Sequence, residues 1–281
     1  MAYRTPPFGN ELYFIEDLEH GGPRVNQIRI NNESAIDYLI PRGWVVGAEL
    51  MQVRSLDDFE YVPANSSIVA NVSCVEEGRW SPGKTKVDSG RAPISVFAAG
   101  WDFEVSRKEW TINSSQRQTQ VWRQVRRQES RSGQRGTNSL AQIMDEDSLM
   151  IPAIADLQRE IKNGLSFYDE QNGLLIALNG NPLLLEFYSN AEGSHRVLRK
   201  TLEALSFDAE VSSFKAMSEA SVNLFIQVAL SLDTPAFLDK HGLTLKCGGS
   251  DSLENRVLTD ASGKVVHFSS INRKHEILLG V

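Results

Sequence analysis

The first hundred residues alternate between apolar and polar positions in short runs, a pattern typical of β-strands. The sequences between these runs, HGGPR, NNES and PRG, have turn compositions. The run at 67–77 has the clearest period of two, and one face of it would carry Ile68, Ala70, Val72 and Cys74. Further short strands are predicted at 11–15, 25–30, 36–40, 44–50, 94–99 and 101–105. We therefore expect a meander or an open barrel-like sheet in this half.

A helical period replaces the alternation after residue 113. Ser114 or Ser115 would cap a helix whose apolar stripe contains Val121, Trp122 and Val125. Other helices are predicted after Thr137, at 152–163 before Gly164, after Ser194 and after Ser218. The dipeptide Thr234-Pro235 should open a short turn of helix that Gly242 closes.

Two continuous apolar runs, GLLIAL and LLLEFY, flank the turn sequence NGNP and predict a hairpin buried on both faces. Strands are also predicted near the C-terminus at LTLKC, RVLT and KVVHFSSI. No linker rich in Pro, Gly or Ser and no repeat divides the chain. We expect one α+β domain, 1–281, with a mixed or antiparallel sheet. A subdivision would separate a β-rich part, 1–112, from a helix-rich part with the hairpin, 113–281.

The composition is that of an ordinary globular protein, with 281 residues, 41% hydrophobic and 23% charged. The apolar runs are far shorter than the ~20 residues of a membrane helix, and the first residues lack the apolar core of a signal peptide. These features predict a cytoplasmic protein without a membrane partner. The net charge of -7 disfavours general nucleic-acid binding. Two cysteines are too few for a disulfide scaffold or a structural zinc site.

The sequence lacks the common motifs of catalytic and cofactor sites. GxGxxG, GxxxxGK[ST], HExxH, GxSxG and CxxC do not occur. The five histidines have no spacing that would place two metal ligands on one face, so we expect no metal site. The cofactor is unknown, and the sequence does not decide whether the protein is an enzyme.

Arginines are concentrated in the predicted helix after residue 113, at positions 117, 123, 126, 127, 131 and 135. Arg123, Arg127 and Arg131 form a stripe at four-residue spacing that suits phosphate. The other interpretation is a solvated face opposite the apolar stripe. Nucleic acid is a weak option, because Trp122 is the one aromatic residue available for stacking there.

Polar residues also gather in the segment SCVEEGRW, residues 73–80. Its Glu76, Glu77 and Arg79 would bind a ligand or form a local ion pair, and Trp80 would be a pocket wall or a core anchor. Upstream, Gln52 and Arg54 alternate and would share one side of an extended segment. We expect Arg54, Glu76 and Arg79 to converge in one pocket.

Cys74 belongs to the apolar row of the predicted strand at 67–77. We expect a buried thiol that is neither a nucleophile nor paired with Cys247, because a thiol in apolar surroundings is less ionised.

These stretches resemble the ADP-ribosylglycohydrolase- and rhodanese-phosphatase-superfamily-associated protein family. The resemblance rests on GAELMQVRS, YVPANSSIVANVSCVEEGRW and QTQVW, and it continues in LKCGGSDSLENRV and KVVHFSS. Val53 stands where the family has Asn, and Glu77 stands where it usually has Gln. The resemblance implies a link to ADP-ribose or NAD metabolism by genomic association, and it implies no particular reaction.

Two functional hypotheses follow. In the first, the protein binds or processes an anionic, nucleotide-like small molecule, with Glu76 as the general acid or base if there is a reaction. The ligand-binding residues would be Gln52, Arg54, Glu77, Arg79, Trp80, Gln118, Trp122 and Arg126. In the second, a non-catalytic structural or interaction protein docks an acidic protein partner through its Arg-rich helix.

Overall fold

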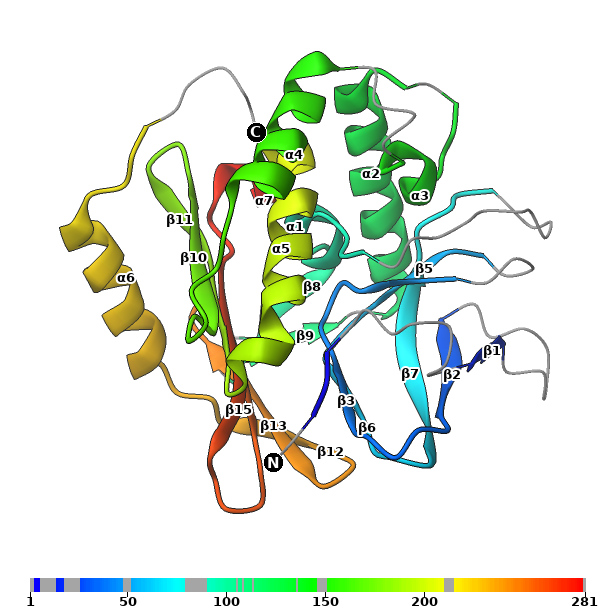
Figure 1. The fold of residues 1–281 in the computed structure, drawn as a ribbon, viewed down its shortest axis with the longest axis vertical. Helices are drawn as coiled ribbons and strands as arrows, with labels where there is room; N and C mark the ends of the chain where they lie inside the picture. Colours follow the sequence, from blue (N-terminus) through cyan, green and yellow to red (C-terminus); the bar gives the residue numbers. More distant parts are fainter. Residues whose placement is uncertain are drawn as a thin grey trace.

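The computed structural model describes residues 3–5, 14–17, 26–47, 52–78, 90–104, 106–107, 109–112, 114–134, 136–145, 151–209 and 215–279. The chain has an α+β fold in which the strand pairs of the sheets run antiparallel, as predicted (Figure 1). Strands dominate the first and last parts of the described chain, most of the helices lie between them in the sequence, and the short helix at Glu276–Leu279 is the last element.

The N-terminal half contains a sheet that curls into an open half-barrel (Figure 1). Its strands, in spatial order, are β1 (Phe14–Asp17), β2 (Gln27–Asn32), β7 (Ser66–Cys74), β5 (Arg54–Leu56) and β4 (Val45–Val46). A separate pair joins β3 (Tyr38–Ile40) to β6 (Glu60–Val62). The predicted row of Ile68, Ala70, Val72 and Cys74 on β7 is buried. Because β7 lies between β2 and β5, the sheet is not a simple meander.

The C-terminal half contains a six-stranded sheet with the hairpin at one edge. Its strands, in spatial order, are β10 (Gly173–Leu178), β11 (Asn181–Tyr188), β15 (Val265–Asn272), β14 (Leu253–Thr259), β13 (Leu243–Gly249) and β12 (Ala236–Lys240). The predicted hairpin is confirmed as β10 and β11. Its turn residues Asn179 and Gly180 have positive φ, which a tight hairpin turn requires.

Helices cover both faces of the six-stranded sheet (Figure 1). The helices are α1 (Ile94–Phe97), α2 (Ser114–Ser132), α3 (Leu140–Ile143), α4 (Pro152–Gly164), α5 (Ala191–Asp208), α6 (Glu219–Ser231) and α7 (Glu276–Leu279). Leu184 packs in one cluster with Phe207 of α5, whereas the adjacent Leu185 packs with Phe225 of α6. Consecutive residues of β11 therefore face different helices, as the continuous apolar run predicts. A small hairpin, β8 (Trp101–Glu104) with β9 (Glu109–Ile112), precedes α2.

Two element predictions are wrong. The predicted strand at 94–99 is the short helix α1, whose residues are all buried, so a hydrophobic period could not distinguish helix from strand there. The predicted helix at 234–242 is instead strand β12 followed by a turn at His241 and Gly242. Pairing with β13 outweighs the helix-start signal of Thr234-Pro235.

Two predicted helix caps also lie at other residues. Asn190 caps α5, because its side chain accepts a hydrogen bond from the Gly193 N–H, whereas Ser194 lies inside the helix. Ser139, rather than Thr137, caps α3. The helices themselves are where the sequence predicts them, within a few residues.

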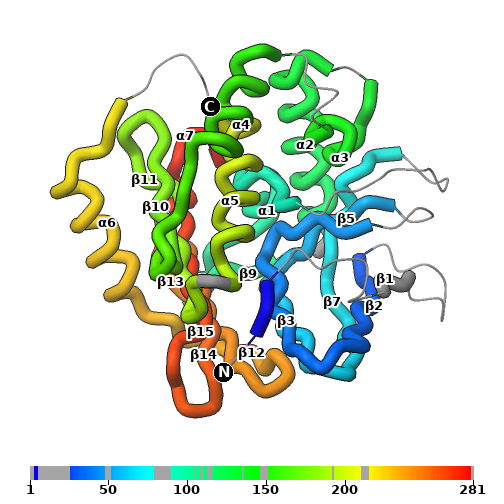
Figure 2. Tube along the Cα trace, viewed as in Figure 1, coloured from blue at the N-terminus to red at the C-terminus, as the bar shows by residue number. Residues whose placement is uncertain are grey.

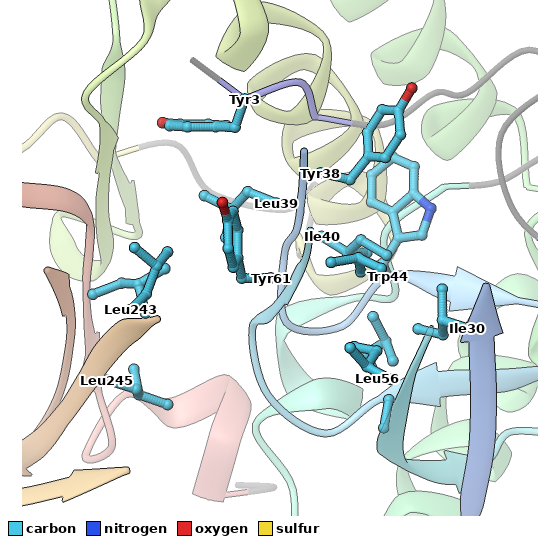
Figure 3. Packing of buried hydrophobic residues seen from close by; sticks show 14 of the residues in the cluster. Tyr3, Ile30, Tyr38, Leu39, Ile40, Trp44, Leu56, Tyr61, Leu243 and Leu245 are labelled. Carbon is cyan, nitrogen blue, oxygen red and sulfur yellow. The ribbon is translucent and has the colours of Figure 1, made fainter. Parts of the chain in front are cut away.

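The largest hydrophobic cluster joins the two halves of the chain (Figure 3). Tyr38, Leu39 and Trp44 of the N-terminal half belong to the same cluster as Leu243 and Leu245 of β13. The N-terminal segment at residues 3–5 also lies between the halves (Figure 2), where the Tyr3 hydroxyl donates to the Val266 carbonyl at 3.2 Å.

Buried ion pairs connect the same halves. Arg91 donates two hydrogen bonds to the carboxylate of Glu186 on β11, at 2.5 and 3.0 Å. Burial alone would raise the pKa of Glu186, but Arg91 and His267 outweigh this effect and hold the pKa at about 2. Glu60 on β6 pairs with Lys240 on β12, and burial raises the pKa of Glu60 to about 7 despite the lysine.

The Glu186 pair predicts a loss of stability in acid. Because the folded pKa, about 2, lies below the ordinary value of 4.5, ionised Glu186 stabilises the fold above pH 4.5, and this contribution falls as the pH drops towards 2. The free energy of unfolding, measured by denaturant titration from pH 6 to pH 2, should therefore fall less steeply in Glu186→Gln than in the wild type. The exposed control Glu170→Gln should keep the wild-type slope. Equal slopes in all three proteins would contradict the assignment.

Candidate functional site

The polar segment singled out in the sequence begins at the end of β7. There Arg54 on β5 lies directly opposite Cys74 in the strand register. The chain continues through Glu76 and Glu77, which lie next to β5 and to the residues before α3. Arg79 and Trp80 lie outside the described residues, so the expected convergence of Arg54, Glu76 and Arg79 stays a prediction.

Glu76 links this strand end to its neighbours. Its side chain is buried, and its carboxylate accepts hydrogen bonds from the Val53 N–H at 2.8 Å and the Ser139 hydroxyl at 2.9 Å. Ser139 is also the N-cap of α3. Glu76 therefore holds β5, the end of β7 and the start of α3 together, which is a positioning role.

Gln118 fastens α2 to the same strand end. Its side-chain carbonyl accepts from the Cys74 N–H at 2.9 Å, and its amide donates to the Cys74 carbonyl at 2.7 Å. A single side chain thus makes both hydrogen bonds that a neighbouring strand would make. The Arg-rich helix therefore crosses this strand end at Gln118.

Three residues of α2 form one stripe over the polar segment, because Gln118, Trp122 and Arg126 follow at four-residue spacing. Trp122 is half-buried beside the Cys74 thiol. Arg126 forms an ion pair with Glu77, and its side chain remains 47% exposed. The stripe therefore combines an amide, an indole and an accessible guanidinium, and we call it the α2 stripe below.

Cys74 is buried next to the α2 stripe. Burial raises the pKa of its thiol, against the lowering effects of the Glu76 main chain, Arg54 and Trp122. The thiol approaches the Glu76 carbonyl at 3.1 Å and the Gln52 side-chain oxygen at 3.7 Å. Both Cys74 and Cys247 are free and buried, and this environment disfavours the thiolate that a nucleophile needs.

The predicted stripe of Arg123, Arg127 and Arg131 serves mostly intramolecular contacts. Arg127 donates to the Ile277 carbonyl in α7 at 3.1 Å, and Arg131 donates to the Asp208 carbonyl at the end of α5 at 2.9 Å. Arginines at such positions satisfy carbonyls at helix C-termini and interact favourably with the helix dipole. Arg123 is exposed and bonds to Gln120 on its own helix. The interpretation as a solvated face therefore holds for Arg123 and not for the other two.

A buried polar network lies behind this site, and the pattern of the sequence did not predict it. Arg117, the neighbour of Gln118, pairs with Asp57, and Asp57 also accepts from the Ser73 hydroxyl at 2.7 Å. In the sequence, the one indication of this network is the pair of adjacent acids Asp57 and Asp58 in an apolar strand region.

Arg256 is the centre of the network in the C-terminal half. It contacts Asp58 and Glu254 at 3.0 Å each, and its guanidinium lies 3.8 Å from the centre of the Trp101 ring. Arg42 binds Glu254 from the N-terminal half at 2.5 Å. Arg256 belongs to a stretch on which the family resemblance rests, and the structure brings it against Asp58 of the N-terminal half.

Other site classes find no support in the described part of the chain. Among those residues, no cluster of His, Cys, Asp and Glu is arranged to hold a metal ion. Across the same ranges, no helix combines the length and apolar character needed to cross a membrane. A shallow hollow of about 470 Å³ is lined by Ser106, Arg107, Asp233, Thr234 and Pro235. None of the residues predicted for the site lines this hollow.

The Gln118 contacts predict a stability effect. In Gln118→Ala, the buried main-chain groups of Cys74 lose both partners, so the free energy of unfolding should fall by about 1–3 kcal/mol. Chemical denaturation measures this change. Gln120→Ala, two positions along the same helix, is the matched control and should stay within about 0.5 kcal/mol of the wild type. Equal losses in both variants would show that Gln118 has no special positioning role.

Comparisons with known proteins agree with the resemblance carried by these residues. No curated protein and no solved structure shows a significant match to the chain. The family model described as the ARG and Rhodanese-Phosphatase-superfamily-associated Protein domain matches residues 10–268. This range includes the α2 stripe, the strand end beneath it and the buried network around Arg256. The chain therefore belongs to the ARG and Rhodanese-Phosphatase-superfamily-associated Protein family.

Proposed function

We propose that the protein binds an anionic, nucleotide-like ligand at the α2 stripe, above the end of β7. The observation that supports this proposal is the alignment of Gln118, Trp122 and Arg126 over the end of β7 and the turn that carries Glu77. An aromatic face next to a guanidinium suits a ligand that has both a base and a phosphate. The family resemblance makes ADP-ribose and NAD derivatives the first compounds to test.

Arg126 is the proposed phosphate ligand. A guanidinium binds phosphate oxygens in a planar, bidentate geometry. Its present partner is the carboxylate of Glu77, whose side chain is 29% exposed, and a partly exposed ion pair of this kind contributes little stability. A ligand phosphate can therefore replace Glu77 at low cost. Arg54, opposite Cys74, adds positive charge behind the site. Arg79 and Trp80 remain proposed members of the same site, with Gln52 at its edge.

In this proposal Glu76 is a positioning residue, because its carboxylate accepts hydrogen bonds from the Val53 N–H and the Ser139 hydroxyl. Its role as a general acid or base stays a separate proposal. Turnover of a bound ADP-ribose compound that Glu76→Gln abolishes without weakening binding would support catalysis. Binding without turnover would leave Glu76 a positioning role alone.

The alternative is a non-catalytic protein that docks an acidic partner through the Arg-rich helix. Arg117, Arg127 and Arg131 are engaged within the chain, so Arg123 and Arg126 would supply the positive surface among the described residues of the helix. Two cations make a weaker docking surface than the six arginines of the sequence suggest. The ligand hypothesis therefore has the better geometric support.

We also propose that residues 1–281 form one α+β domain, because the site needs both parts of the chain. Glu76 and Glu77 come from the β-rich part, whereas the α2 stripe comes from the helix-rich part. Buried pairs such as Arg91–Glu186 join the two. Thermal unfolding should then be a single transition with equal calorimetric and van't Hoff enthalpies. Two separable transitions would contradict one domain.

Calorimetric titration with ADP-ribose, NAD and inorganic pyrophosphate tests the ligand proposal. Arg126→Ala should weaken binding by roughly 1.5–3 kcal/mol, the contribution of a hydrogen bond to a charged group, with an unchanged melting temperature. Arg123→Ala removes an exposed arginine from the same helix, outside the α2 stripe, and is the matched control. It should bind as the wild type does.

Two results would overturn the ligand proposal. One is the absence of binding for all three compounds. The other is equal weakening by Arg123→Ala and Arg126→Ala, which would indicate nonspecific attraction to the helix. If both variants also lost binding to an acidic protein, the docking alternative would gain support.

A further inference from the structure

Strand β12, Ala236–Lys240, is an edge strand of the six-stranded sheet. On one side it pairs with β13, and its other side pairs with no strand among the described residues. An unpaired edge presents main-chain N–H and C=O groups that can add a strand from another chain. The outer edge of β12 is therefore a candidate site for pairing with a strand of another chain.

The side chains of β12 protect this edge only in part, because Asp239 is the one charged residue exposed on it. Phe237 is 75% exposed and Leu238, on the opposite face, is 54% exposed. Protected edges usually carry free charges, especially lysine. The lysine here, Lys240, instead turns back to Glu60 and donates to both of its carboxylate oxygens, at 2.9 and 3.0 Å. Two large apolar side chains thus remain in water on a strand of five residues.

The turn after β12 shows which main-chain groups point outward. His241 and Gly242 both have positive φ, at 57° and 94°, which is the geometry of a two-residue type I′ turn. Such a turn makes the flanking residues, Lys240 and Leu243, a hydrogen-bonded pair. By alternation along the strand, Phe237 and Asp239 direct their N–H and C=O groups away from β13.

We propose that β12 pairs antiparallel with β12 of a second copy of this chain, about a two-fold axis at Phe237. In this register Phe237 faces Phe237 of the partner subunit, and Ala236 faces Leu238 of the partner subunit. Each six-stranded sheet then continues into the other across the axis. The pairing covers apolar side chains on both faces of β12 at once.

The ends of the strand fit the same register. Asp233 precedes β12 and His241 follows it in the turn, so in an antiparallel pair Asp233 comes to the same end of the contact as His241 of the partner subunit, and an acid approaches a group that can donate to it. Pro235 has no N–H, but its carbonyl can accept from the outward N–H of Asp239 of the partner subunit. A register centred on Leu238 would instead place each Asp239 carboxylate against a Phe237 ring. Charge complementarity therefore favours the axis at Phe237.

A two-fold pair is also a closed assembly, which cannot grow by further copies of the same contact. The outer edges of both β12 strands are used in one contact, so neither β12 can recruit a third copy. This separates the proposed dimer from open-ended pairing of β12 with a different edge, which would produce filaments.

Analytical ultracentrifugation of the full chain over a concentration series tests the proposal. The wild type should show a monomer–dimer equilibrium. Phe237→Lys places two like charges at the axis and should raise the dimer dissociation constant at least roughly tenfold. Leu224→Lys is the matched control, because Leu224 is 61% exposed on α6 and lies outside the proposed contact. It should dimerise as the wild type does. All three proteins should share one melting temperature at concentrations low enough for the wild type to be monomeric.

A thiol crosslink tests the register. In Phe237→Cys, a short bifunctional thiol reagent should join two chains efficiently, whereas Leu224→Cys should give only monomer. The two native cysteines are buried and do not compete. A monomeric wild type at every concentration would overturn the dimer. A dimer that Phe237→Lys does not weaken, or that crosslinks through Leu238→Cys in preference to Phe237→Cys, would overturn this contact or its register.

Discussion

The structure depends on charges that are buried between its two halves. Arg91 with Glu186, and Arg42 with Glu254, are almost completely removed from water. Removing a charge from water costs several kcal/mol, and an unpaired buried charge is strongly destabilising. Arg91 and Arg42 belong to the N-terminal half and have their carboxylate partners in the C-terminal half, so the N-terminal half cannot bury these two arginines alone. This constraint favours a single arrangement of the half-barrel against the six-stranded sheet, more strictly than apolar packing would.

The candidate site takes its position from the same network. Asp57 lies beside Asp58 in the network and binds Arg117, which precedes Gln118 on α2. The helix is therefore held by a buried ion pair at one residue and by the Cys74 main chain at the next. Trp122 and Arg126 lie further along this helix, and the contacts of Arg117 and Gln118 fix the orientation of its first turns. A site that depends on a half-buried indole and an exposed guanidinium needs this kind of rigid support.

The two proposed surfaces differ in how the fold treats their charges. At the α2 stripe, a partly exposed arginine keeps a weak carboxylate partner that a stronger anion can replace. At β12, the lysine that would guard the edge is withdrawn into a pair with Glu60, and apolar groups stay exposed. Charge placement therefore leaves one surface suited to anions and the other suited to a strand.

The sequence by itself determined the elements that have a one-sided burial pattern. The alternation at 67–77 predicted β7, and the apolar stripe predicted α2. The structure places Gln118 against Cys74 and Arg126 against Glu77, whereas the binding roles assigned to these residues from the sequence stay predictions. Only the tertiary structure decided α1, which is buried on every side, and β12, which depends on pairing with β13. It also decided which charges meet. Arg127 and Arg256 look like solvated residues in the sequence, because a charge shows no partner until residues far apart in the chain are packed together.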